Sequence, residues 1–344
     1  MFGQLGVDSA KFPMMTNFVE VLVSGVKAVA AGGEHTMVLR QDGSVLATGT
    51  NAFGQLGVGS NTDNDRFVQV MPSHAKAIAA GAKHSLVVIR DGSMWAAGCN
   101  QQGQLGDDSR THRNRFVQVI FDGADTVAAG SEHSIVLKQD GSVWTTGLNS
   151  NGQLGLGLKS ARLKQKFVQV ISSESRGGTK AIAAGSYHSM VLKQDGSLWA
   201  TGKNKFGQLG DGTATTRFRF VQVIARDVEA IAAGHDHSIL LKQDSSVWTA
   251  GNNNYGQLGD GSTYSSNKFV PVIASSVQAV AAGDWHSMVL KYDGSLWSTG
   301  RNIYGQLGDG STYQKRNFVG VVSSRDGEFH VQIGAKFNFF FVFY

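Results

Sequence analysis

The 344-residue chain contains a single cysteine and three prolines, and charged residues make up only 17% of it. With Cys99 alone no internal disulfide can form, which is typical of a protein kept in a reducing compartment. No segment reaches the roughly 20 apolar residues of a membrane-spanning helix, and the start has no basic region followed by an apolar stretch. We therefore expect a soluble intracellular protein, cytoplasmic or nuclear, with no membrane partner.

Runs of basic residues are also missing. The formal net charge of +5 is spread along the chain. This excess only weakly suggests a nucleic-acid or chromatin partner, because solubility explains it equally well. No segment of ten or more residues shows an apolar period of 3.6, so the sequence predicts almost no helix.

What the chain has is repetition. The tetrapeptide Gly-Gln-Leu-Gly occurs seven times, at intervals of 49 to 55 residues, and a second marker, Ala-Gly-x-x-His, follows the same interval. A period of this length indicates a solenoid, a propeller or an array whose modules bury their apolar faces against each other. We therefore interpret residues 1–344 as one repeat domain.

Each repeat contains four short strands. In the unit 181–224, strands are predicted at 181–185, 188–193, 197–201 and 220–224, from their β-branched and alternating apolar residues. The second and third strands are separated by Asp-Gly, which favours a tight hairpin because both residues tolerate positive φ. In one repeat the dipeptide is Asp244-Ser245, and there we expect a slightly different turn.

Four-stranded units that cannot stand alone can close into a ring that leaves only short edges exposed. The sequence therefore predicts an all-β protein, a seven-bladed β-propeller of four-stranded antiparallel blades. The small Ala-Ala-Gly strand suits the crowded axis and is placed innermost. A tryptophan in the third strand is expected to pack blade against blade, at Trp95, Trp144, Trp199, Trp248 and Trp297.

Both ends of the chain are predicted to form the closing blade. Phe18-Val19-Glu20-Val21 would join two strands from the C-terminus, where Phe337 stands at the position of the repeated histidine. The Asp-Gly-Ser-x-Trp strand is missing from this unit, so the blade is expected to be incomplete. The spacing by two predicts that one neighbouring blade contacts Phe339, Phe341 and Phe343, and the other contacts Phe340 and Val342.

Three linked motifs resemble the repeat of the regulator of chromosome condensation family: Ala-Ala-Gly-x-x-His-Ser-x-x-Leu, Asp-Gly-Ser-x-Trp-x-x-Gly-x-Asn and Gly-Gln-Leu-Gly-Asp-Gly-Ser/Thr. The resemblance covers nearly the whole chain and implies a seven-bladed β-propeller. It also implies a range of activities: guanine-nucleotide exchange on the small GTPase Ran with chromatin binding, ultraviolet sensing, modules of ubiquitin ligases and β-lactamase inhibition. The fold therefore does not choose the function.

The repeated histidines could be interpreted as a metal site. Each begins the second strand, away from the axis, and no cysteine or carboxylate accompanies it at a fixed offset. We interpret them instead as structural residues that hydrogen-bond their own or the adjacent blade, and we expect no metal and no cofactor. They are His35, His84, His133, His188, His237 and His286.

The two variable residues of each Ala-Gly-x-x-His turn are the candidate binding site. In an up-and-down blade these turns lie on the same face as the Gly-Gln-Leu-Gly loops. Mixed charge with aromatics is typical of a binding hot spot, and the alternative is that these are solvated turn residues without a partner. The candidate residues are Glu34, Lys83, Glu132, Tyr187, Asp236 and Trp285.

No catalytic triad, paired-carboxylate site or metal-ligand cluster interrupts the repeats, so we predict that the protein is not an enzyme. We predict a propeller that binds a protein partner through the face carrying the variable turns. The alternative is a guanine-nucleotide exchange factor for a small Ran-like GTPase. A third class, an ultraviolet sensor, needs clustered exposed tryptophans, and only Trp285 lies outside the packing positions.

Overall fold

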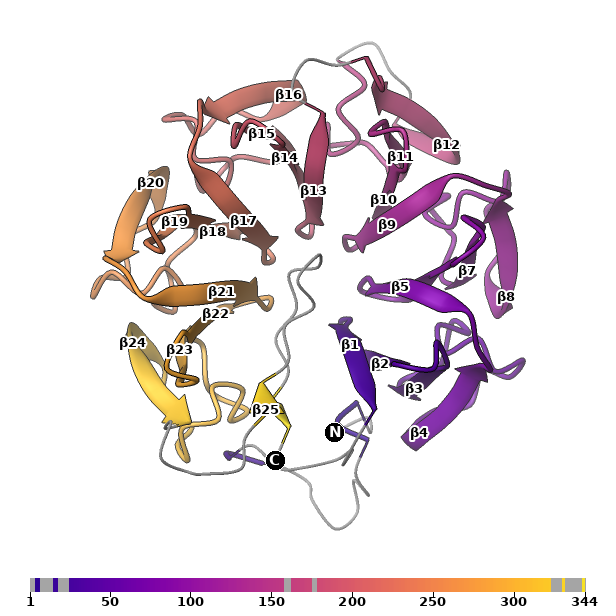
Figure 1. Ribbon diagram of the computed structural model, residues 1–344, viewed down its shortest axis with the longest axis horizontal. Coiled ribbons are helices and arrows are strands. Elements are labelled where there is room, and N and C mark those ends of the chain that lie inside the picture. The colour runs from indigo at the N-terminus through magenta and orange to yellow at the C-terminus, as the bar shows by residue number, and fades with distance from the viewer. Residues whose placement is uncertain are drawn as a thin grey trace.

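The protein is a ring of β-sheets around a central axis (Figure 1). A computed structural model describes residues 4–6, 15–17, 25–157, 162–174, 178–322, 330–331 and 342–343. These residues form six four-stranded antiparallel sheets and one pair of two-residue strands. Within each blade the strands follow chain order, and the first strand lies innermost while the fourth lies at the rim (Figure 1). No helix occurs among the described residues.

The strands of the first three blades have these bounds. Blade 1 comprises β1 (Val26–Ala31), β2 (His35–Arg40), β3 (Val45–Gly49) and β4 (Asn64–Met71). Blade 2 comprises β5 (Ala75–Ala80), β6 (His84–Ile89), β7 (Met94–Gly98) and β8 (Arg113–Ile120). Blade 3 comprises β9 (Ala124–Ala129), β10 (His133–Lys138), β11 (Val143–Leu148) and β12 (Leu163–Ile171).

The remaining blades repeat this pattern. Blade 4 comprises β13 (Thr179–Ala184), β14 (His188–Lys193), β15 (Leu198–Gly202) and β16 (Arg217–Ile224). Blade 5 comprises β17 (Val228–Ala233), β18 (His237–Lys242), β19 (Val247–Gly251) and β20 (Ser266–Ile273). Blade 6 comprises β21 (Val277–Ala282), β22 (His286–Lys291), β23 (Leu296–Gly300) and β24 (Lys315–Val322).

The core lies between the blades. One cluster combines Met190 and Leu198 of blade 4 with Ile231 and Leu240 of blade 5, and Trp248 of blade 5 packs against it. The corresponding clusters at the two flanking interfaces are covered by Trp199 and Trp297. Each of these tryptophans donates its indole N–H to a serine in its own blade, which satisfies the only polar group of the ring.

The hairpin between the second and third strands is the same in all six blades. At Asp42-Gly43 the carboxylate of Asp42 accepts a hydrogen bond from the Ser44 N–H (2.8 Å), and Gly43 has φ 84°. Ser245 adopts φ 65°, and the Ser246 N–H donates to Asp244 at 2.9 Å. The sequence-based expectation of a different turn at this position is therefore wrong. The Asp carboxylate fixes the turn, and Ser245 is held in the left-handed conformation that its Cβ disfavours.

We therefore expect Ser245→Gly to stabilise the protein by about 1 kcal/mol, because glycine adopts this conformation without the steric cost of a Cβ. The gain is measured by chemical denaturation of both proteins. The matched control is Ser246→Gly, which should lower stability because Ser246 Oγ accepts the Trp248 indole N–H at 2.9 Å. A Ser245→Gly protein no more stable than the parent would contradict the proposed strain.

Six blades, rather than the predicted seven, are present among the described residues, and no closing blade formed from both termini is seen. Among the described residues, loop contacts connect the N-terminal segment to blade 6 and to blade 1. Asn17 pairs with Asp309 in an isolated bridge, the Gly310 N–H donates to Thr16 O (2.9 Å), and Thr36 Oγ1 donates to Gln4 O (2.7 Å). The physical reason is that this unit lacks the Asp-Gly-Ser-x-Trp strand, which in the other blades pairs with both the second and the fourth strand.

The predicted strands at the two ends have different outcomes. β25 (His330–Val331) pairs antiparallel with β26 (Val342–Phe343), and β25 lies in the sector between blades 6 and 1 (Figure 1). No four-stranded closing sheet accompanies this short pair among the described residues. The segment 18–21 and the residues Phe337, Phe339, Phe340 and Phe341 lie outside the described residues.

Candidate functional site

The repeated histidines link neighbouring blades. In each of the first five blades the histidine Nε2 lies 2.9 Å from the Oγ of a serine in the next blade, as for His133 and Ser189. That serine in turn donates to the backbone carbonyl of the glutamine in the preceding blade's Gly-Gln-Leu-Gly loop, as for Ser189 and Gln153 (2.6 Å). A serine hydroxyl carries one proton, so Nε2 must be the donor to the serine oxygen. Each link is thus a chain from histidine to serine to loop carbonyl, with the proton on Nε2.

Burial keeps these histidines neutral. Loss of hydration lowers the pKa of His35 and His188 to about 4 and that of His84, His133 and His237 to about 3. Nearby histidines contribute to the lowering for His84, His133 and His237. Within the described ranges no group of three or more metal-ligating side chains occurs. The geometry therefore makes the histidines part of the interface between blades.

Backbone hydrogen bonds link the variable turns to each other and to the end of the third strand. The N–H of the first variable residue donates to the neighbouring turn, as from Ser186 to Gly234 O (3.3 Å) and from His235 to Asp284 O (3.1 Å). The carbonyl of the second variable residue accepts from the residue that follows the third strand, as Tyr187 O does from Lys203 N (2.8 Å). These backbone hydrogen bonds do not depend on which side chains occupy the two positions.

The turns and the Gly-Gln-Leu-Gly loops lie on one face, which we call the loop face. Gln208, in the loop of blade 4, donates from its side chain to Asp236 in the turn of blade 5 at 2.7 Å. The rings of Tyr255, in a loop, and Trp285, in a turn, are 5.7 Å apart. Of the candidate residues, Glu34 and Lys83 are exposed, and Glu132, Tyr187 and Trp285 are half-buried.

Blades 4 to 6 carry a continuous series of aromatic and cationic side chains across the loop face. His235 stacks on Trp285 (centroids 4.4 Å apart, planes at 23°) and meets the edge of Tyr187 (5.9 Å). Tyr187 and Phe206 lie beneath Lys203, at 5.4 and 5.5 Å. We call the whole series the aromatic–cation ladder; it consists of Phe206, Lys203, Tyr187, His235, Trp285, Tyr255, Arg301 and Tyr304.

Asp236 differs from its sequence-based assignment as a partner-binding residue. It is only 2% exposed, and it pairs with Lys203 (3.1 Å) and lies 3.1 Å from His235 Nδ1. Although burial opposes its ionisation, the neighbouring His235 and Lys203 side chains keep the pKa of Asp236 below its ordinary value. Burial, together with the charges of Glu132 and Asp236, raises the pKa of Tyr187. Asp236 therefore positions two members of the ladder, and His235 is the more exposed residue of this turn.

Arg301 occupies the other end of the ladder. Its guanidinium carbon lies 5.2 Å from the Tyr255 ring centroid and 5.6 Å from that of Tyr304, distances at which cation–π attraction operates. No carboxylate lies within ion-pairing distance of it among the residues the structure describes. Its Nε is buried and has no hydrogen-bond partner there either.

Sequence reasoning missed five members of the ladder that lie next to the repeated motifs. The position immediately before Gly-Gln-Leu-Gly holds Phe206, Tyr255 and Tyr304 in blades 4 to 6, and the position after the third strand holds Lys203 and Arg301. In blades 2 and 3 the first of these positions holds Gln102 and Asn151. No binding residue was predicted in these loops from the sequence, and the aromatic residues at this fixed offset were the available signal.

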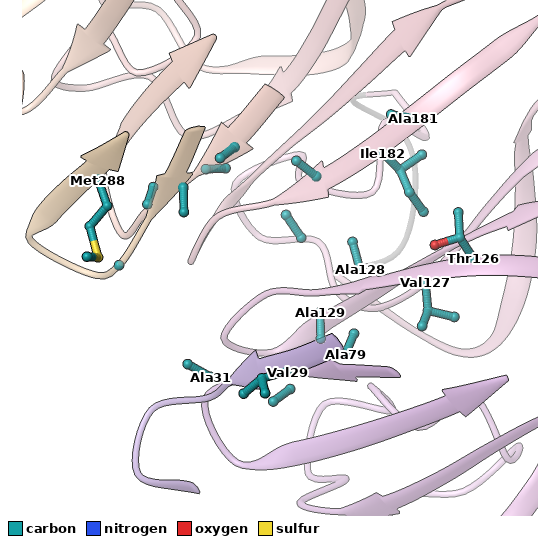
Figure 2. Close-up of a pocket in the computed structure, with 18 of the residues that line it drawn as sticks. Val29, Ala31, Ala79, Thr126, Val127, Ala128, Ala129, Ala181, Ile182 and Met288 are labelled. Carbon is teal, nitrogen blue, oxygen red and sulfur yellow. The ribbon is translucent and has the colours of Figure 1, made fainter. Parts of the chain in front are cut away.

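A cavity lies on the axis of the ring. The cavity, of about 260 Å³, is lined by the inner strands and by side chains such as Val29, Ala128 and Ile182 (Figure 2). This agrees with the predicted innermost place of the Ala-Ala-Gly strand. Its described lining offers two polar side chains, Thr126 and His286, which is few for orienting a polar ligand.

A model of the RCC1-like domain matches residues 1–219, which is more than half of the chain. The chain belongs to this family. Models of the regulator of chromosome condensation (RCC1) repeat match residues 244–290 and, in a second form, residues 228–257 and 277–306. A comparison with curated proteins found no match for this RCC1-like domain.

Solved structures share the fold of this RCC1-like domain. Human WBSCR16 superposes with a TM-score of 0.77 at 21% identity, over 89% of this chain and 83% of that one. Prp20p from Saccharomyces cerevisiae superposes with a TM-score of 0.75 at 22% identity, over 88% of this chain and 78% of that one. Its structure was described together with its binding properties to Gsp1p and histones. These identities support a common fold alone.

No helix among the described residues is both long and apolar enough to cross a membrane.

Proposed function

We propose that this RCC1-like propeller is a non-catalytic binding module that holds a protein partner on its loop face. The observation that carries the proposal is the aromatic–cation ladder, which crosses three adjacent blades without a break. Tryptophan, tyrosine and arginine are the residues most enriched in binding hot spots. Turns whose backbone hydrogen bonds do not depend on the side chains suit a surface selected for recognition rather than for folding.

The contacts within the ladder also favour binding. His235 stacks on Trp285, and Tyr255 meets Trp285 edge to face, so the rotamers of these side chains are fixed before a partner arrives. Fixed side chains lose little conformational entropy on binding, which leaves more of the contact energy as affinity. Tyr304 is 61% exposed and Ile303 46%, so apolar area remains available beside the fixed rings.

We expect Tyr187→Ala combined with Trp285→Ala to weaken partner binding by 2 kcal/mol or more, about thirtyfold, while the protein stays folded. The measurement is capture of partners from a cell extract on immobilised protein, followed by titration of the captured partner. The matched control is Phe121→Ala with Tyr292→Ala. These side chains are 80% and 65% exposed and lie in turns on the opposite face. Equal capture by the ladder variant and the parent would refute the site.

The alternative function is guanine-nucleotide exchange on a small GTPase. It is supported by the likeness to Prp20p, whose described binding includes Gsp1p, at an identity that supports the fold alone. The separating experiment is release of a fluorescent guanine nucleotide from a panel of small GTPases. Acceleration that is lost in the Tyr187→Ala/Trp285→Ala protein would assign exchange to the loop face, and no acceleration on any GTPase favours the binding module.

A further inference from the structure

We infer that Arg301 is the binding point for a carboxylate of the partner, and that the ligand of the loop face is an acidic peptide segment with an aromatic or large aliphatic residue beside its carboxylate. This inference rests on the proposed function and specifies its partner. The site consists of Arg301, the two tyrosines Tyr255 and Tyr304 beside it, and the neighbouring Trp285 and Ile303, and we call it the Arg301 slot.

The first argument is the unsatisfied state of Arg301. Its buried Nε lacks a hydrogen-bond partner among the described residues, and such an atom costs free energy until it finds an acceptor. Lys203, at the other end of the ladder, provides the contrast, because it is already neutralised by Asp236 at 3.1 Å. One cation of the ladder, Lys203, is thus paired with a carboxylate, and the other, Arg301, has no anionic partner among the described residues.

The second argument is the shape of the slot. Tyr255 and Tyr304 lie near the guanidinium at 5.2 and 5.6 Å from their ring centroids, so contact with these rings limits how the group can turn. The N–H groups at the edge of a guanidinium match the two oxygens of a carboxylate in a paired, parallel geometry. The backbone N–H of Arg301 donates to Trp285 O (2.9 Å), which ties the two residues together through their backbones.

The third argument is the charge around the slot, which favours a peptide over a nucleic acid. Asp284 adjoins Trp285 and is exposed, and Glu34 is exposed in another turn of the same face. A nucleic acid carries a phosphate at every nucleotide, so these carboxylates would repel it along its path. A peptide can place one or two carboxylates at the slot and leave neutral residues near Asp284. The exposed Ile303 and Tyr304 then supply the surface for an apolar residue of that peptide.

The test is selection of random twelve-residue peptides displayed on phage against the immobilised full chain, with soluble Arg301→Gln protein present to remove peptides that bind elsewhere. We expect the selected sequences to share Asp or Glu next to an aromatic or large aliphatic residue. A synthetic copy should bind the Arg301→Gln protein about tenfold more weakly or worse, and the Arg301→Lys protein at an intermediate level, because lysine keeps the charge but not the paired geometry. Free and amidated C-termini separate a terminal carboxylate from a side-chain one.

The outcomes separate this inference from the function on which it rests. Selected peptides that lack any carboxylate, or no peptide that depends on Arg301, would overturn the Arg301 slot. A parallel selection without the soluble competitor recovers peptides that do not need Arg301. If those peptides depend on Trp285 and Tyr187 but not on Arg301, the binding module stands and the acidic partner does not. If binding depends on none of the three, both fail. A labelled oligodeoxythymidylate that binds more tightly than the peptides, in an Arg301-dependent way, would assign a nucleic acid instead. Thermal melting shows that each variant is folded.

Discussion

Replacing Gly185 by alanine is expected to abolish folding or to lower the free energy of unfolding by about 4 kcal/mol or more. A Cβ at this position would lie 2.2 Å from Cε1 of the buried His188 and 2.5 Å from the carbonyl oxygen of Gly234 in the next blade. Neither neighbour can retreat, because His188 is held by Ser238 at 2.9 Å and Gly234 O accepts the Ser186 N–H. The clash therefore opens the interface between blades 4 and 5.

The matched control is Gly320→Ala in β24. There the nearest atom to an added Cβ is Trp297 Cε2 at 3.7 Å, an ordinary contact distance, so the variant should melt within a few degrees of the parent. Both proteins are compared by circular dichroism and by chemical denaturation. A Gly185→Ala protein that unfolds at the same denaturant concentration as Gly320→Ala would mean that the interface can move apart without cost.

Lowering the pH from 7 to 4 is expected to unfold the protein through its interblade histidines. Their pKa values of about 3 to 4 lie below the ordinary 6.5, so the unfolded chain binds protons more readily than the folded one. The full stability is thus present above pH 6.5 and falls as the pH drops from 6.5 towards 4. At pH 5 the loss is about 2 kcal/mol per histidine, on the order of 10 kcal/mol for five if the contributions add. A loss of that size is comparable with the whole stability of a typical domain.

The aspartates lose their contribution in a different pH range. Hydrogen bonds with Ser93 lower the pKa of Asp91, and a network that includes Arg217 lowers that of Asp211 despite its burial. Stability from these groups is present above their ordinary pKa of 3.8 and is lost only below it. Denaturation curves recorded every half pH unit therefore distinguish the two groups. Constant stability from pH 7 to pH 4.5 would contradict the assignment of neutral, Nε2-protonated histidines.

The strands could be predicted from the sequence because every level of the pattern agrees. Turn residues, alternating apolar residues and small inner strands recur in each repeat. A strand that is ambiguous in one repeat can therefore be assigned from the same position in another. The blade count could not be obtained in this way, because one of the seven Gly-Gln-Leu-Gly copies is the first, at 3–6. Of this copy, Gln4 supplies a loop contact, and no described sheet accompanies it. The turn at Ser245 was mispredicted because the rule stressed the glycine, whereas the Asp carboxylate fixes the turn.

The candidate site was predicted only in its position. Tyr187 and Trp285 lie where the turn pattern placed them, but the sequence did not show that His235 would connect them. Nor could it show that Asp236 would turn inward to Lys203, since the two are 33 residues apart and meet only when blade 5 packs on blade 4. Contacts of this kind depend on the angle between blades, which no periodicity encodes.

In each of the first five blades the histidine donates to a serine that lies later in the chain, and this direction has a consequence for synthesis. His35 needs Ser85, and His188 needs Ser238, so a blade leaving the ribosome cannot form its interblade hydrogen bonds until the second strand of the next blade has been made. Assembly therefore lags translation by about one repeat. Fragments cut between repeats would end in such an unfinished blade, so a half-propeller should be recovered in folded form only when its complementary half is supplied.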